Sequence, residues 1–403
     1  MKKWIFLPLM VLLFFIALPI VFFPYIANKP FGFLPQQTLS DEANQLIQKA
    51  FDDLEEPWVD YHVHLVGLGT QDTFVNPKMK SFWHPLQYYL YHIYLRVGGI
   101  SDEHKANAQY LQQLIGWIKG FPKPGKVNLL ALDKFYRQNG KVDLDQTTFY
   151  VSNNIVNEVA QRYPQIFNRT ISVHPYRQDA LEELQKWHQR GVRIIKWIPN
   201  AMGVDPSDPA LEAYYDFVKT HDMVILTHSG IELAVDAASY QQFGNPLLWK
   251  NALDKGVKVI FAHVGSLGQC EDLDHADTPQ VDCFDLAIRM MSHPKYTHHL
   301  FADISATVLI NRKSDVLQTL LSRTDLHPRL INGSDYPIPA INVVISLQLL
   351  AHRGLLKQAE IAPLREIYDH NPLLFDFVLK RTIAHPETDQ RFPAALFIEN
   401  KNI

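Results

Sequence analysis

Eight short apolar runs recur along this chain, and a segment with helical periodicity separates most of them. The runs cover residues 58–65, 126–132, 169–174, 192–198, 223–228, 257–263, 299–305 and 329–335. The helical segment before the fourth run ends at Gly191, a residue type that suits the end of a helix. Eight strands alternating with helices predict an α/β fold, a (β/α)8 TIM-type barrel with its chemistry at the carboxyl ends of the strands. An open doubly wound sheet is the alternative, but no glycine-rich phosphate loop follows the first run.

The 403 residues divide into three predicted segments. Residues 1–29 are expected to form a membrane anchor, 30–57 a linker and a leading helix, and 58–403 the barrel. An insertion at about 68–125 separates the first two strand-like runs. Because this insertion starts on the catalytic face, it either covers the site or shapes its pocket; helix packing or a subunit contact is the alternative. A homo-oligomer is left open.

The N-terminal segment is uncharged over residues 4–26, 23 positions that are enough to cross a hydrocarbon layer of ~30 Å as a helix. Lys2 and Lys3 precede it and Lys29 follows, so the positive-inside rule keeps the N-terminus in the cytoplasm. The barrel is then expected on the non-cytoplasmic side, in the periplasm or at the cell exterior. A cleaved signal peptide is the alternative, although no small-x-small cleavage site follows.

The net charge limits the classes of partner that are expected, and the cysteine content bears on the cellular compartment. The formal net charge of −4 shows no basic footprint, which excludes nucleic acid as an expected partner. The chain has two cysteines, Cys270 and Cys283, with a polar stretch between them. In an exported protein such a pair predicts a disulfide, and two free thiols are the alternative.

Candidate metal ligands lie in or at the ends of five of the runs. His62 and His64 alternate in DYHVHLVG, so both side chains are expected on one side of a strand. The other polar residues at these positions are Lys196, His228, His263 and Asp335. Imidazoles and a carboxylate that converge at one barrel mouth predict a divalent metal, zinc or a similar ion. Lys196 is costly to bury as an ammonium, which favours a shifted pKa or a covalent modification; a lysine that reaches solvent is the alternative.

These same motifs, with HVH, GVRIIKW and GSDYP, resemble the amidohydrolase superfamily and its amidohydrolase-2 branch over residues 58–380. The resemblance implies a distorted barrel with one or two metal ions. With two ions, His62, His64 and Asp335 would hold the buried ion and His228 and His263 the exposed one. Lys196, carboxylated by carbon dioxide, would bridge them. With one ion, the ligands would be His62, His64, His228 and Asp335. His263 would then act as an acid, a base or a polarising group.

The expected activity is hydrolysis of an amide, ester, lactone or related bond of a small molecule by a metal-activated water, with Asp335 and His263 as catalytic residues. Deaminases of this superfamily carry a glutamate three residues after the fifth-strand histidine. Ile231 holds that place and Glu232 comes one later, which disfavours deamination. A decarboxylase or other lyase of the same superfamily is the alternative. A non-catalytic binding protein of the cell envelope is the third hypothesis.

The sequence says least about how the substrate is recognised. His174 and Arg177 follow the third run and Asn200 follows the fourth, so they are predicted to meet a polar or anionic group. A surface charge for Arg177 and a supporting hydrogen bond for His174 are the alternatives. Asp303, near the end of the seventh run, could orient a metal-bound histidine or make a structural hydrogen bond. No residue identifies the substrate.

Overall fold

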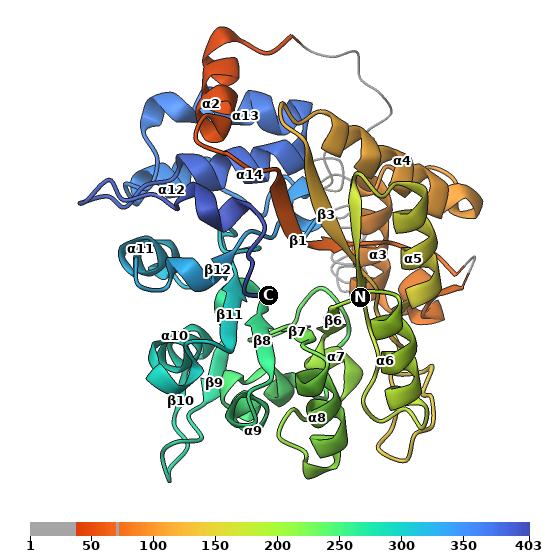
Figure 1. Cartoon of the computed structure of the whole chain (residues 1–403). Helices are drawn as coiled ribbons and strands as arrows, with labels where there is room; N and C mark the ends of the chain where they lie inside the picture. Colours follow the sequence, from red (N-terminus) through yellow and green to blue (C-terminus); the bar gives the residue numbers. More distant parts are fainter. Residues whose placement is uncertain (1–37, 70–71) are drawn as a thin grey trace, which may run out of the picture.

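The computed structural model describes residues 38–69 and 72–403, and at its centre lies a sheet of eight parallel strands surrounded by helices (Figure 1). The strands are, in their order around the sheet, β1 (Trp58–His64), β3 (Gly125–Leu130), β5 (Phe167–Ile171), β6 (Ile194–Trp197), β7 (Val224–Thr227), β8 (Lys258–Phe261), β11 (Leu300–Asp303) and β12 (Leu330–Ile331). Each predicted run overlaps one of them; β3 and β5 begin one and two residues before their runs. The expected α/β barrel is therefore confirmed.

Backbone hydrogen bonds close the barrel between β1 and the chain after β12. The amide of Tyr61 donates to the carbonyl of Asn332 at 2.9 Å, and the amide of Asp335 donates to the carbonyl of His62 at 2.8 Å. The amide of His64 donates to the carbonyl of Tyr336 at 3.0 Å. The last strand therefore delivers Asp335 directly beside the two histidines of the first.

Helices cover the outside of the barrel, as alternation of strand and helix requires. They are α2 (Asp41–Phe51), α3 (Pro85–Val97), α4 (Ala106–Lys119), α5 (Asn153–Arg162), α6 (Ala180–Gln189), α7 (Pro199–Met202), α8 (Glu212–Thr220), α9 (Lys250–Asp254), α10 (Cys283–Ser292), α11 (Val316–Ser322), α12 (Leu347–His352), α13 (Ile361–His370) and α14 (Pro372–Thr382). The leading helix that the sequence predicts is α2, which Ser40 caps and which packs beside α13 and α14 (Figure 1).

Two antiparallel strand pairs lie outside the barrel. The insertion after β1 contains β2 (Thr73–Val75), and α3 and α4 come after β2 in the chain. β2 pairs with β4 (Phe149–Val151), which follows β3. After β8, β9 (Gln269–Glu271) pairs with β10 (Gln280–Asp282). Both pairs follow the carboxyl ends of barrel strands, so both belong to the loops on the face where barrel enzymes place their chemistry.

A register shift in β1 changes which side chains face the barrel interior. Val59 and Tyr61 belong to the interior apolar cluster, whereas Val63 packs in the outer core between barrel and helices. The pairing of β1 with β3 shifts between Asp60 and Val63, as a β-bulge does. A bulge reverses the alternation of side chains and is common beside active sites. It brings the even-numbered His62 and His64 to the inner side.

The predicted membrane anchor lies outside the described residues, because it falls within 1–37. Within residues 38–69 and 72–403, none of the helices has the length and apolar character needed to span a membrane. Anchoring and location therefore stay predictions.

Candidate functional site

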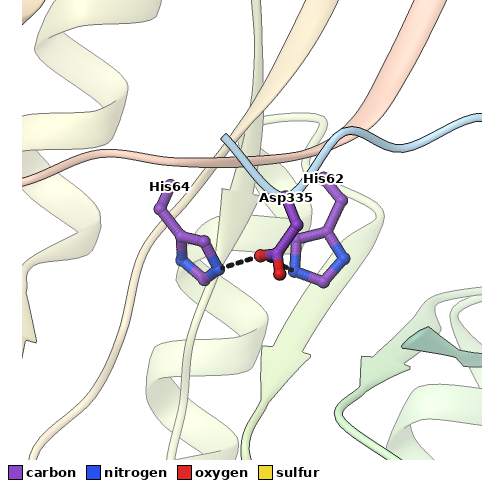
Figure 2. A group of neighbouring side chains, drawn as sticks. All are labelled: His62, His64 and Asp335. Atoms are coloured by element: carbon purple, nitrogen blue, oxygen red, sulfur yellow. Dashed lines mark hydrogen bonds and ion pairs between the residues drawn. The ribbon is translucent and has the colours of Figure 1, made fainter. Parts of the chain in front are cut away.

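The imidazoles of His62 and His64 meet the carboxylate of Asp335 at the mouth of the barrel (Figure 2). His64 Nε2 lies 3.0 Å from Asp335 Oδ1, and His62 Nε2 lies 3.5 Å from the same oxygen. The ligand atoms of these three residues all lie within 4.8 Å of one another. Two imidazole nitrogens and one carboxylate oxygen at this spacing are a donor set that zinc or manganese can use.

The carboxylate of Asp303, at the end of β11, fixes the orientation of two histidines. Its Oδ2 lies 2.8 Å from His62 Nδ1, and its Oδ1 accepts the backbone amides of His263 and Ser305 at 2.9 and 3.0 Å. The hydroxyl of Ser305 also donates to Oδ1. Since an ionised carboxylate only accepts, the proton of His62 sits on Nδ1. Its Nε2 lone pair therefore faces the cluster.

The same reasoning fixes the tautomer of His263. Its Nδ1 lies 2.7 Å from the hydroxyl oxygen of Ser305, whose own proton is donated to Asp303. His263 must therefore donate from Nδ1, which leaves the lone pair of Nε2 free. That Nε2 lies 3.9 Å from Asp335 Oδ2. Both Asp303-supported histidines thus present an unprotonated nitrogen toward Asp335.

The backbone is strained at the two predicted catalytic residues. His263 and Asp335 have φ angles of 58° and 64°, and Val264 has 51°. Left-handed conformations of residues other than glycine cost on the order of 1–3 kcal/mol, and they cluster at functional sites. Hydrogen bonds to the backbone amides of His263 and Asp335 hold these turns in place.

Lys196 is buried beside the cluster, with Nζ 3.2 Å from His62 Nε2. Because His62 carries its proton on Nδ1, its Nε2 is the acceptor of this hydrogen bond. Burial lowers the pKa of Lys196 to about 8, although Asp303 and Asp335 oppose the shift. The lysine predicted from its place in an apolar run therefore reaches the site.

Two groups of candidate metal ligands lie among the described residues: His62, His64 and Asp335, and His62, His263 and Asp303. His228 lies next to them but belongs to neither group. Its ring centroid is 5.2 Å from that of His263. Its Nδ1 lies 3.1 Å from Glu232 Oε2, and its Nε2 lies 3.3 Å from the carbonyl of Ile231. Protein groups therefore face both ring nitrogens.

Protonation states in the cluster favour cation binding. Burial lowers the pKa of His62 to about 4 and holds that of His263 well below its usual range, so both are neutral at pH 7. Burial alone would raise the pKa of Asp335, but the hydrogen bond with His64 is among the interactions that keep it below its usual range. The site thus combines neutral imidazoles with an ionised carboxylate.

The cluster opens into a cavity of about 280 Å³. Leu90, Tyr94 and Leu95 of α3 form one wall, and the hydroxyl of Tyr94 donates to the carbonyl of Ala234 at 2.9 Å. The insertion after β1 therefore shapes the pocket, one of the two roles that the sequence left open. Among the other lining residues are Leu68, Ile198, Leu233, Leu309 and Ile341. The cavity wall is predominantly apolar.

The structure does not bring the three predicted substrate-binding residues to this cavity. His174 Nε2 lies 2.9 Å from the carbonyl of Met202, and Arg177 forms ion pairs with Asp133 and Asp179. Asn200 is fully buried and donates to the carbonyl of Gly230 at 3.1 Å, among other partners. All three fasten loops around the barrel, because each already has protein partners.

The sequence analysis did not identify three residues that contribute to the site. Glu232 partners His228, Ser305 sets the tautomer of His263, and Arg312 lines the cavity. Ser305 follows Asp303 by two residues, and Glu232 follows His228 by four. Their closeness to the strand ends is the sequence feature that could have identified them as site residues. Arg312 lies further along the loop after β11, where the sequence shows no pattern.

The structure joins Cys270 in β9 to Cys283, the first residue of α10, by a disulfide. The bridge closes the loop after β8, where the sequence placed it. Neither cysteine lines the cavity. Its role is therefore in the stability of this loop.

No family model matches the chain, and neither does any curated protein. Similar solved structures include an uncharacterized TIM-barrel protein from Bordetella bronchiseptica, with 15% identity over 77% of this chain and 99% of that chain, at a TM-score of 0.48. A 5-carboxyvanillate decarboxylase from Novosphingobium aromaticivorans, with bound manganese, has 10% identity over 81% and 95% at a TM-score of 0.46. A proposed 2-pyrone-4,6-dicarboxylic acid hydrolase from Pseudomonas putida has 14% identity over 74% and 94% at a TM-score of 0.39.

At these identities and TM-scores the similarity leaves the reaction undetermined. The names include decarboxylases, a hydratase and a hydrolase.

Proposed function

We propose that this protein is a metal-dependent hydrolase that cleaves an amide, ester, lactone or related bond of a small molecule. The observation that carries the proposal is the convergence of His62, His64 and Asp335 at the mouth of the barrel, beside an apolar cavity. An apolar pocket with a few convergent polar groups is typical of an active site.

The residues present fit a divalent cation, zinc or manganese. His62, His64 and Asp335 would hold it, since the two Nε2 atoms and a carboxylate oxygen already face one another. When bound, the cation would supply Lewis acidity and lower the pKa of a coordinated water toward ~7.

The protein groups supply proton transfer and orientation. Asp335 is ionised and can accept a proton from a nucleophilic water and pass it to the leaving group. His263 presents the free lone pair of Nε2 on the same side, where it can take part in the same transfer. Apolar residues line most of the cavity, and charge interactions are stronger in such surroundings than in water.

Lys196 limits how a cation can bind. The lone pair of His62 Nε2 accepts from Lys196 Nζ, and it cannot serve an ammonium and a cation together. Metal binding therefore favours a neutral or modified Lys196, and its pKa of about 8 makes loss of the proton accessible near neutral pH. We extend the proposal to carboxylation of this lysine, which would replace its positive charge by a negative one.

A decarboxylase is the second candidate, and one observation favours it. His228 is outside both groups of candidate ligands among the described residues, and the group of His62, His64 and Asp335 suits one ion without using His263. A single-ion site with a free histidine is what the lyase alternative requires.

Metal content and products separate the two reactions. We would measure metal per chain by elemental analysis of full-length protein purified without chelators. Lactones, dipeptides, esters and aromatic carboxylates would then be screened: new acid indicates the hydrolase, and released carbon dioxide the lyase. Asp335→Asn should remove nearly all turnover, whereas Asp272→Asn, a buried carboxylate outside the cavity, should not. Wild-type turnover by Asp335→Asn would contradict the role of this residue.

We also propose that residues 4–26 tether the protein to a membrane with the barrel on the non-cytoplasmic side. The uncharged segment and the disulfide support this, since disulfides persist in oxidising compartments. Protease added to intact cells or spheroplasts should digest the barrel. Protection of the barrel until the inner membrane is broken would contradict the orientation.

A further inference from the structure

Arg312 is a half-buried cation with unused hydrogen-bonding capacity at the wall of the cavity. It lies in the loop after β11 and lines the same cavity as His62 and Asp335. Its Nε donates to the carbonyl of Ala306 at 3.1 Å, which fixes the direction of the guanidinium. Its Nη1 is buried and has no hydrogen-bond partner in the described part of the chain.

The nearby carboxylates are already engaged by other residues. Asp335 pairs with His64, Glu232 with His228, and Asp303 with His62. Among the described residues, 38–69 and 72–403, Arg312 belongs to none of the ion pairs. Burial lowers its pKa to about 10, so it stays charged at neutral pH. A guanidinium that has one nitrogen buried without a hydrogen-bond partner and no paired anion is costly, and this cost falls when an anion binds.

The rest of the cavity is suited to an apolar molecule. Leu90, Leu95, Ile198, Leu233 and Ile341 supply its walls. A ligand that fills this space and satisfies Arg312 must combine an apolar body with an anionic group. Guanidinium pairs with carboxylate through two parallel hydrogen bonds, which also sets orientation.

We infer that Arg312 binds a carboxylate of the substrate, and that the substrate is an apolar molecule with one such group besides the bond that reacts. This inference rests on the proposed function, since it assigns the substrate class of the same site. Arg312 would orient the apolar body along the α3 wall. It takes the place that the sequence assigned to Arg177, whose guanidinium is paired with Asp133 and Asp179.

Binding of a matched ligand pair tests this without turnover. Phenylacetate and its neutral counterpart phenylacetamide would be titrated by calorimetry into full-length protein, both after chelator treatment and after loading with Mn²⁺. Arg312→Met should weaken phenylacetate by about tenfold or more and leave phenylacetamide unchanged, as expected for loss of a charge-assisted hydrogen bond. Arg162→Met, which changes an exposed arginine at the end of α5, should bind both ligands like the wild type.

The outcomes separate this inference from the proposed function. Selective loss of phenylacetate affinity in either form supports Arg312 as the anion site, even where Mn²⁺ fails to bind and the metal proposal falls. Equal effects on both ligands, or no phenylacetate binding to the wild type in either form, would overturn the inference and leave the metal site untouched. Where Arg312→Met fails to fold, Arg312→Lys decides: it keeps the charge but loses the paired geometry, so it should retain a weaker preference for the carboxylate.

Discussion

His62 Nδ1 lies 2.8 Å from Asp303 Oδ2, and both side chains are buried. This contact links the first strand of the barrel to the seventh. Because Asp303 can only accept, the contact places the histidine proton on Nδ1 and directs the Nε2 lone pair at Asp335. A carboxylate that orients a histidine in this way raises its basicity as a ligand.

Asp303→Asn should therefore weaken metal binding by about 10–100-fold. The asparagine amide can donate to His62 Nδ1, which would move the histidine proton to Nε2 and remove the lone pair that faces the cluster. Titration with Mn²⁺, followed by calorimetry, measures the change. Asp272→Asn is the matched control, since it alters a buried carboxylate away from the cavity. Equal affinities for both variants would contradict the orienting role.

Lys196 should make metal affinity depend on pH. Its ammonium competes with a cation for His62 Nε2, and burial lowers its pKa to about 8. Affinity for Mn²⁺ should rise between pH 6.5 and 8, as the lysine loses its proton, and then level off. Lys196→Met should flatten this rise. Titrations at several pH values, with and without added bicarbonate, measure both effects; a bicarbonate response of the wild type alone would support carboxylation.

The barrel and most of the cluster could be predicted because they follow from local patterns. Each strand is a short apolar run, and the polar residue at its end, such as His263 or Asp335, stands out from that run. Parallel strands deliver these ends to one face, so convergence follows from topology. The alternation of His62 and His64 correctly placed them on the same side.

The features that could not be predicted from the sequence depend on three-dimensional geometry that local residue patterns do not show. The register shift in β1 decides that His62 and His64 face inward, and no residue between Asp60 and Val63 marks it. Arg177 and Arg312 are equally plausible anion sites by residue type. Only the fold shows that Arg177 is paired with two carboxylates and that Arg312 lines the cavity.

His174 should make the fold less stable at low pH. Its Nδ1 accepts the amide of Tyr176 at 3.2 Å, its Nε2 faces the carbonyl of Met202, and burial lowers its pKa to about 3. An unfolded histidine titrates near 6.5, so between about pH 6.5 and 3 the unfolded state binds more protons. Stability therefore falls as the pH is lowered, by up to about 1.4 kcal/mol per pH unit from this residue.

His174→Gln should reduce that dependence, because glutamine does not titrate. Urea denaturation at pH 7, 6, 5 and 4 gives the slope for each protein. His104→Gln, at an exposed histidine in the insertion, is the control and should keep the wild-type slope. A wild-type slope in His174→Gln would show that this histidine is not held neutral by the fold.

The disulfide should stabilise the loop after β8 without affecting the metal site. Cys270 and Cys283 are 13 residues apart, and closing a loop of this length stabilises a protein by about 3 kcal/mol in the chain-entropy model. The double variant Cys270→Ala/Cys283→Ala should lose free energy of unfolding on that order while it binds metal like the wild type, because neither cysteine lines the cavity. Denaturation with and without a phosphine reductant measures the effect. The reductant should lower the denaturation midpoint of the wild type to that of the variant and leave the midpoint of the variant unchanged. If the fully reduced wild type keeps its original midpoint, the bridge adds no stability.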